Sequence, residues 1–328
     1  MTSLHRRHFV AGLVAASAGL VGRPVLAAPD RLVKIGALTE SWGPTPSIVG
    51  LRDGLQELGY REEKDFTIGV RFTSGKGAEL PAAARDLVRH GVDIIVATES
   101  GRVAKAAQSA TSQIPIVVIG SGDPVALGLV RSLRHPGGNI TGVADLDVEL
   151  VPKRLEIFRE LIPGLKRVLV PYDVTNADVA AQLAVHRQAA LRLGLTLMER
   201  PVKSEEEART SISGVRKGDA DGILSVRSLG WNIPGFIVEV AQRGGLPTMF
   251  HAPYFVELGG LACYASNTYE LGRQAARVVQ KILKGARPGD LPVEQPTKFE
   301  LVFNRKTART LGLTIAPSLL LRADRLIQ

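Results

Sequence analysis

The chain has 328 residues, more than one hydrophobic core usually serves, so its length predicts two domains. Its formal net charge is +9, but basic residues are mixed with acidic ones and form no long run. This pattern gives no support to a nucleic-acid partner. The single cysteine, Cys263, excludes an internal disulfide, and its position far from the N-terminus excludes N-terminal lipid attachment.

The N-terminal residues match a secretory signal peptide. Arg6 and Arg7 precede an apolar run at 9–21 that is too short to span a bilayer comfortably, and small residues lead to Ala27. We expect cleavage near Ala27, which makes 1–27 a signal peptide and places the mature protein in the periplasm. The paired arginines favour the twin-arginine export route. An ordinary Sec signal and a membrane anchor are the alternatives that the residues leave open.

After the signal, short apolar runs alternate with segments of helical periodicity. Apolar residues recur at spacings of three and four between Ile48 and Leu58, and Gly59 stops this helix. Continuous Ile and Val runs, such as the one at 94–96, suit strands covered on both faces. The first series predicts strands at 32–38, 66–72, 93–97 and 114–119, and helices at about 48–58, 78–90 and 103–112.

A turn cluster at 135–139 interrupts this alternation, which then starts again. The second series predicts strands at 167–170, 196–201, 222–226 and 247–250, and helices at about 177–193, 205–217 and 234–243. Two strand-helix-strand series with one break predict an α/β protein of two doubly wound lobes with parallel sheets.

The last part of the chain does not fit one independent domain. A helix at 269–284, a proline-marked connector at 291–296, a strand at 299–303 and a short helix at 305–311 follow the second series. We therefore expect the chain to cross between the lobes three times. One lobe is expected to comprise 29–142 with 264–290, and the other 143–263 with 291–328.

The sequence lacks the motifs of the common catalytic and cofactor sites. It has no nucleophile elbow, no zinc-protease helix, no Cys-x-x-Cys and no phosphate-binding loop of the Walker type. We therefore expect no catalytic residue, no metal and no cofactor. The run from Gly120 to Pro124 follows a strand and has only two glycines, so we expect Asp123 to cap a helix that begins at Pro124.

Polar and aromatic residues gather just after the predicted strands, where open α/β folds bind ligands. Each of these residues alone can be an ordinary helix cap or a solvent-exposed group. Together, loops from two lobes that face one cleft are expected to form a ligand site. The expected ligand-binding residues are Ser41, Thr98, Ser100 and Asp123 from the first lobe, and Tyr172, Asp173, Arg227 and Tyr264 from the second lobe or hinge. Tyr172 is expected to stack on the ligand, Asp123 or Asp173 to accept from an ammonium, and Arg227 to pair with a carboxylate.

Several long motifs resemble the ABC-transporter substrate-binding protein family that includes tryptophan- and tyrosine-binding members. They are IPIV at 114–117, GDPVALGLV at 122–130, PGGNITGV at 136–143, LPVEQPTKFELV at 291–302 and LGLTIAPSLLLRAD at 311–324. The resemblance implies a type I periplasmic-binding-protein fold, with two lobes joined by a hinge and the ligand between them. It also implies an ABC permease and its ATPase as partners of a protein that we expect to be monomeric.

The chain departs from that family at two loops. Its residues 98–101 read TESG where a small Thr-Gly-Thr-like run is usual, so Glu99 adds a carboxylate. Relatives often have a Tyr-Asn-Pro type loop, which has no acidic residue, where this chain has Asp173. Arg227 stands at a position where relatives frequently have an acidic residue. These changes argue against an aromatic amino acid as the ligand.

The sequence thus predicts a periplasmic protein, without enzymatic activity, that delivers a small molecule to an ABC importer. A sensor that presents its ligand to a membrane receptor is the alternative. A hydrolase or another enzyme ranks third, because no nucleophile with a base is recognisable.

Overall fold

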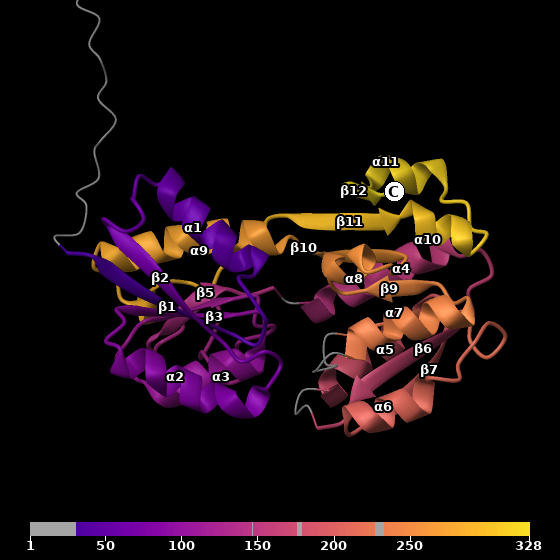
Figure 1. Cartoon of the computed structure of the whole chain (residues 1–328), viewed down its shortest axis with the longest axis horizontal. Helices are drawn as coiled ribbons and strands as arrows, with labels where there is room; N and C mark the ends of the chain where they lie inside the picture. The colour runs from indigo at the N-terminus through magenta and orange to yellow at the C-terminus, as the bar shows by residue number, and fades with distance from the viewer. Residues whose placement is uncertain (1–30, 146, 176–178, 227–232) are drawn as a thin grey trace, which may run out of the picture.

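The computed structural model describes residues 31–145, 147–175, 179–226 and 233–328 (Figure 1). The expected signal peptide at 1–27 lies outside these residues. Two β-sheets, each flanked by helices, form two lobes that lie side by side (Figure 1). This confirms the predicted α/β fold of two lobes with mainly parallel sheets. Within the described ranges, no helix is both long and apolar enough to cross a membrane.

The first lobe contains a parallel five-stranded sheet in the order β2-β1-β3-β4-β5. One apolar cluster fills the space between this sheet and the helices α1 and α9, and a second lies between its other face and α2 and α3. The strands are β1 (Val33–Thr39), β2 (Phe66–Phe72), β3 (Ile94–Thr98), β4 (Ile116–Ile119) and β5 (Ile140–Val143). The helices are α1 (Pro46–Glu57), η1 (Gly77–Glu79), α2 (Leu80–Arg89), α3 (Gly101–Ala110) and α9 (Thr268–Leu283).

The second lobe contains a seven-stranded sheet in the order β12-β11-β10-β9-β8-β6-β7. Its strands pair in parallel except for β11, which runs antiparallel to β10. The strands are β6 (Arg167–Asp173), β7 (Thr196–Val202), β8 (Gly222–Leu224), β9 (Thr248–Phe250), β10 (Ala262–Ser266), β11 (Phe299–Asn304) and β12 (Arg325–Ile327). The helices are η2 (Asp147–Leu150), α4 (Val151–Leu161), α5 (Val179–Arg192), α6 (Glu205–Ile212), α7 (Ile233–Gly244), α8 (Pro253–Glu257), α10 (Arg305–Thr310) and α11 (Pro317–Arg322).

Helix α9 follows a strand of the second sheet but packs on α1 in the first lobe. Glycines make this approach possible, because a methyl group at Gly50 would lie 2.0 Å from the carbonyl oxygen of Tyr269. A methyl group at Gly272 would lie equally close, 2.0 Å from the carbonyl oxygen of Ser47. The backbones of α1 and α9 therefore touch, which holds α9 in the first lobe.

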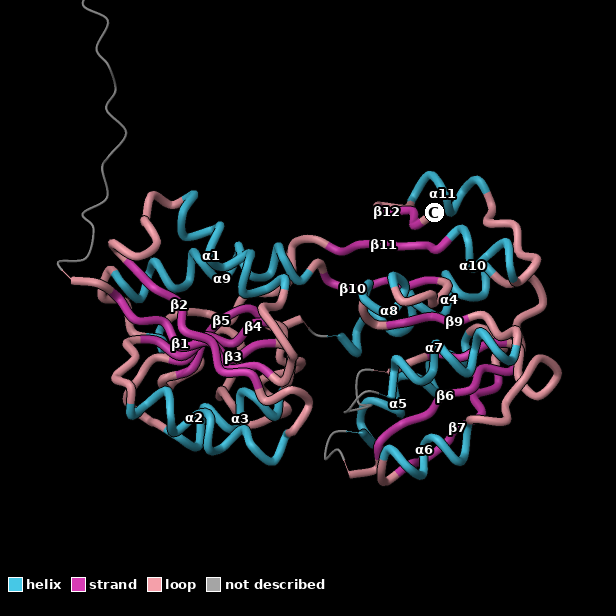
Figure 2. The backbone as a smooth tube through the Cα atoms, in the orientation of Figure 1, coloured by secondary structure: helices cyan, strands magenta, loops and turns pink. Residues whose placement is uncertain are grey.

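The chain passes between the two lobes after β5, after β10 and before β11, and the first of these links contains residue 146, which lies outside the described residues (Figure 2). The third link bonds to both of the others. The Ala144 amide donates to the Glu294 carbonyl at 2.9 Å, and the Asn267 amide donates to the Lys298 carbonyl at 3.0 Å. Strand β10 continues to Ser266, and Glu294 forms an isolated bridge with Val143 of β5.

A buried ion pair fixes the second-lobe side of these links. The Arg154 side chain is only 2% exposed and binds both carboxylate oxygens of Asp147, one of them at 3.1 Å. Its Nε donates to the Tyr264 carbonyl at 2.7 Å. Burial raises the pKa of Asp147, but the charge and hydrogen bonds of Arg154 outweigh it and hold that pKa below its usual range. We call Asp147, Arg154 and Tyr264 the Arg154 clamp, because their contacts connect the start of η2 to β10.

Some expected elements differ from the structure. The expected helix at 205–217 ends at Ile212, and the strand β5 and the helix α4 were not predicted. The expected helix after Asp123 is wrong, since residues 124–128 form a run of turns. Gly128 has a φ of 63°, a left-handed conformation that does not continue a helix. The turns that begin at Pro124 therefore end at Gly128.

We predict that breaking the Arg154 clamp strongly destabilises the protein, because it leaves a buried charge without its partner. Replacing Arg154 by Met leaves the Asp147 carboxylate without its buried partner, so the free energy of unfolding should fall by about 3–5 kcal/mol. Urea denaturation measures it. The control is Arg187→Met, which breaks the more exposed ion pair with Glu199 and should cost much less, because solvent screens that pair. Equal losses in the two variants would contradict this prediction.

Candidate functional site

The links determine which ends of the two sheets face each other. In the first lobe the carboxyl end of β5 leads into a link, and β4, β3 and β1 run parallel to β5. In the second lobe the carboxyl end of β10 leads into a link, and β9, β8 and β6 run parallel to it. The carboxyl ends of both sets of strands therefore point toward the other lobe, as the strand arrows in Figure 1 show.

Each lobe has one topological switch point, where the chain leaves neighbouring strands in opposite directions. The order β2-β1-β3-β4-β5 places it between β1 and β3, and the equivalent order β7-β6-β8-β9-β10 places it between β6 and β8. Ligands of open α/β sheets bind at the carboxyl edge of such points. The candidate site therefore consists of two switch points, one from each lobe.

At the first switch point, Glu99 directly follows β3 and has a φ of 67°. This left-handed conformation costs a residue with a side chain on the order of 1–3 kcal/mol, and such strain gathers at functional sites. The Glu99 amide donates to the Ile119 carbonyl at 2.8 Å, and Ser47 Oγ donates to Glu99 Oε1 at 3.2 Å. Ser47 is completely buried at the start of α1 and also contacts Thr45 Oγ1 at 2.8 Å.

Three of the predicted first-lobe residues belong to the same two strand ends. Ser41 follows β1, and its Oγ donates to the Gly43 carbonyl at 2.5 Å. Thr98 ends β3, is fully buried, and its Oγ1 donates to the Leu38 carbonyl at 3.4 Å. Ser100 caps α3 by accepting from the Arg102 amide at 3.2 Å. All three side chains have a structural partner at the switch point.

Asp123 lies one loop further along the sheet, after β4. Its Oδ1 accepts from the amides of Val125 at 2.8 Å and Ala126 at 3.2 Å, so it caps the turns that follow. In the same loop the Gly122 amide donates to Asp145 Oδ1 at 2.9 Å. The carboxyl edge of the first lobe thus holds Glu99, Asp123 and Asp145. Arg102, at the start of α3, pairs with Glu40 at 3.2 Å.

The second switch point contains one predicted site residue and has another beside it. Asp173 ends β6, is buried, and accepts from the Thr175 amide at 2.8 Å and the Thr175 hydroxyl at 2.6 Å. Tyr172 is half-buried and packs on the core of the second lobe. Arg227 lies outside the described residues. Tyr264 lies on β10 by the links, where its ring stacks on Phe299 at 6.1 Å between centroids.

Two serines at strand ends were not predicted. Ser121 follows β4 and Ser225 follows β8, and the two residues are 3% and 1% exposed. Among the described residues, neither hydroxyl has a hydrogen-bond partner. A buried hydroxyl without a partner is unfavourable by about 1–3 kcal/mol, so such a group needs an explanation. The only sequence signal is a small polar residue directly after an apolar strand, which also marks ordinary turns.

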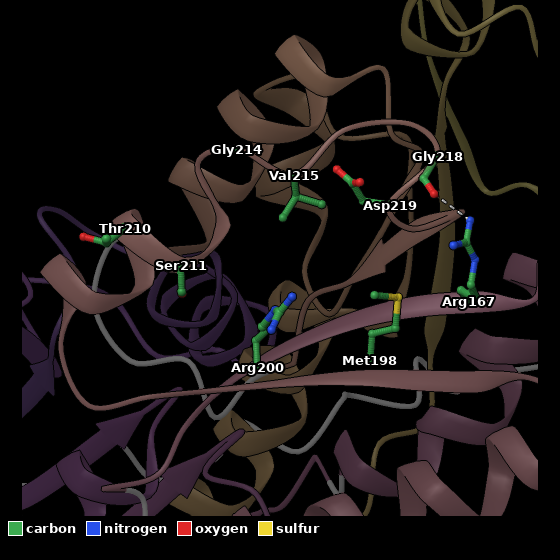
Figure 3. A pocket seen from close by; sticks show the side chains of 9 residues that line it. All are labelled: Arg167, Met198, Arg200, Thr210, Ser211, Gly214, Val215, Gly218 and Asp219. Carbon is green, nitrogen blue, oxygen red and sulfur yellow. Dashed lines mark hydrogen bonds between the residues drawn. The ribbon is translucent and has the colours of Figure 1, made fainter.

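A surface pocket of about 490 Å³ lies elsewhere, on the second lobe (Figure 3). Arg167 at the amino end of β6 and Asp219 before β8 place it toward the amino ends of the strands. Arg167 there donates to the Gly218 carbonyl at 3.0 Å. We place the candidate site at the switch points, because this pocket lies on one lobe only. Within the described part of the chain, no group of three or more His, Cys, Asp or Glu residues is arranged to hold a metal ion.

The chain is similar to known binding proteins over almost its whole described length. A family model described as ABC transporter substrate binding protein matches residues 33–327. A tyrosine-binding protein of Clostridioides difficile is 27% identical over 266 residues, which cover 80% of this chain and 76% of that protein.

Two solved structures share the fold. A conserved domain protein from Vibrio cholerae has a TM-score of 0.81 and 30% identity, with coverage of 90% of this chain and 99% of that one. An ABC domain from Streptococcus pneumoniae, solved in complex with L-Trp, has a TM-score of 0.82 and 28% identity, with coverage of 90% and 100%.

We predict that Ser121 contributes nothing to the stability of the unliganded fold. Ser121→Ala removes a buried hydroxyl that has no partner in the described chain, so the free energy of unfolding should stay the same or rise by up to about 1 kcal/mol. Ser47→Ala removes a buried hydroxyl with two partners and should lower it by about 1 kcal/mol. Urea denaturation of both variants compares them, and an equal loss would contradict the assignment.

Proposed function

Because the chain belongs to the ABC transporter substrate binding protein family, we propose that it is an extracytoplasmic binding protein that delivers a small organic solute, such as an amino acid, to an ABC importer. The observation that carries this proposal is the pair of switch points whose strand ends face each other across three links. One switch point alone offers a shallow half-site. Closure of the two lobes would bury most of a small solute.

The relatives support the amino-acid class. One is named for tyrosine binding, and another was solved with bound L-Trp. In this chain Glu99 and Asp173 add carboxylates to the strand ends, so we propose an amino acid or related amine whose side chain need not be aromatic. The partners would be an ABC permease and its ATPase. We propose that the protein acts as a monomer, needs no cofactor or metal, and catalyses no reaction.

We propose that the solute contacts residues from both lobes. The lobes themselves would move as units that comprise approximately 29–142 with 264–290, and 143–263 with 291–328. A carboxylate has about four acceptor positions, so the capping bonds of Asp123 and Asp173 leave capacity for a solute. The proposed contacts are Ser41, Thr98, Ser100, Asp123, Tyr172, Asp173, Arg227 and Tyr264 from the sequence, and Ser121 and Ser225 from the structure.

The first test is a thermal-shift screen of the purified protein against the standard amino acids, small carboxylates and nucleosides. A solute that binds only the folded form at 100 times its Kd stabilises it by about 2.7 kcal/mol, which raises the melting temperature clearly. We expect such a shift with at least one amino acid, and a smaller shift with Asp173→Ala. Failure of every solute to shift the wild-type protein would contradict the proposed function. Loss of cellular uptake of the same solute after gene deletion would distinguish an importer from a sensor.

Export provides a separate prediction. We propose that residues 1–27 direct the chain through the twin-arginine route and are removed near Ala27. Replacing Arg6 and Arg7 by lysines should therefore retain the precursor in the cytoplasm, as cell fractionation followed by immunoblotting would detect. Normal export of this variant, together with a block by Sec inhibition, would contradict the twin-arginine route.

A further inference from the structure

Glu99 occupies the centre of the first switch point. It is the first residue after β3, and β3 is the middle strand of the sheet. Its amide bonds to the end of β4 through the Ile119 carbonyl, so the strained backbone at this position is fixed on the sheet. A glutamate stands here although glycine would adopt the same φ without strain.

The Glu99 carboxylate is positioned by a buried neighbour. Ser47 Oγ donates to Glu99 Oε1, and Ser47 is held by Thr45 and by the tight contact of α1 with α9. Because Ser47 is completely buried, it has little freedom to follow a moving carboxylate. The Glu99 side chain, by contrast, is only partly buried. The fold thus directs one carboxylate to the carboxyl edge of the sheet and leaves part of its side chain accessible.

The adjacent loop offers a second group that suits the same kind of ligand. Ser121 follows β4, beside β3, and its hydroxyl is buried with no partner in the described chain. A protonated amine has three N–H donors and no acceptor, so a carboxylate and a hydroxyl oxygen together match it. A deprotonated carboxyl group of a ligand, by contrast, has no donor for the Glu99 carboxylate.

We propose that Glu99 is a specificity residue that selects solutes with a protonated amine and binds this amine at the first switch point. The inference rests on the function proposed above. It assigns the cationic end of the solute to the first lobe. A solute without an amine offers no N–H donor to the Glu99 carboxylate, so it should bind more weakly.

The test compares Glu99→Gln with wild type by calorimetry. The solutes are the amino acids that shift the wild-type melting temperature, together with L-tyrosine, L-tryptophan and the des-amino analogue of each. For amine-bearing solutes we expect Kd to rise about tenfold or more in the variant, because a hydrogen bond to a charged group is lost. For des-amino analogues the variant should bind as tightly as wild type or more tightly.

The chain offers a matched control. Glu63 is a second glutamate with positive φ, 61°, but it lies in an exposed turn before β2, at the amino end of the sheet. Glu63→Gln should bind every solute as wild type does. If Glu99 were only structural, Glu99→Gln would weaken all solutes equally and leave the preference for amines unchanged.

The outcomes separate the two proposals. Binding of an amine-bearing solute with equal Kd in wild type and Glu99→Gln overturns the role of Glu99 and leaves the proposed function intact. Equal affinity of wild type for an amino acid and its des-amino analogue overturns it as well. If wild type binds none of the solutes, the proposed function fails, and the selection by Glu99 fails with it.

Discussion

The direction of the strands is the constraint on which the rest of the molecule depends. A strand that leads into a link must point its carboxyl end at the other lobe, and parallel pairing extends this direction to β1, β3 and β4 and to β6, β8 and β9. The loops that follow these strands must therefore lie on the edges of the two sheets that face each other. Under the proposed function, the solute would contact short loops held on two sheets, an arrangement that positions the binding residues precisely.

The links can transmit closure only if each lobe stays rigid next to them. In the first lobe the glycine contact of α1 with α9 provides this rigidity, and in the second lobe the Arg154 clamp ties η2 to β10. A buried ion pair adds little net stability compared with apolar packing, but it has strict geometry. Under the proposed function, rotation between the lobes would fall on the few described residues between these anchors, near 144–145, 266–267 and 295–298.

The sequence predicted the repeated strands and helices because periodicity and glycine stops are local signals. It missed β5 and α4, since four residues such as ITGV are too short to be recognised as a strand and the start of α4 has no side-chain cap. The Arg154 clamp could not be predicted either, because only the tertiary fold brings Asp147, Arg154 and Tyr264 into contact. The position of polar residues after strands could be predicted. Most of their hydrogen-bond partners could not: Asp123 was expected to be a cap, but Ser100 and Asp173 were selected without their capping bonds.

The polar groups at the strand ends therefore differ in a way that only the structure reveals. Ser100, Asp123 and Asp173 stabilise local turns, so their loss changes the shape of the loops as well as any contact with a solute. The hydroxyls of Ser121 and Ser225 have no hydrogen-bond partner in the described fold, and the backbone conformation of Glu99 is strained. Strained residues and buried polar groups without a partner lower the stability of the unliganded protein. Such groups are expected at binding sites, where a ligand can supply the missing partner. Under the proposed function, Ser121, Ser225 and Glu99 are therefore better indicators of the solute than the capping residues that sequence patterns select first.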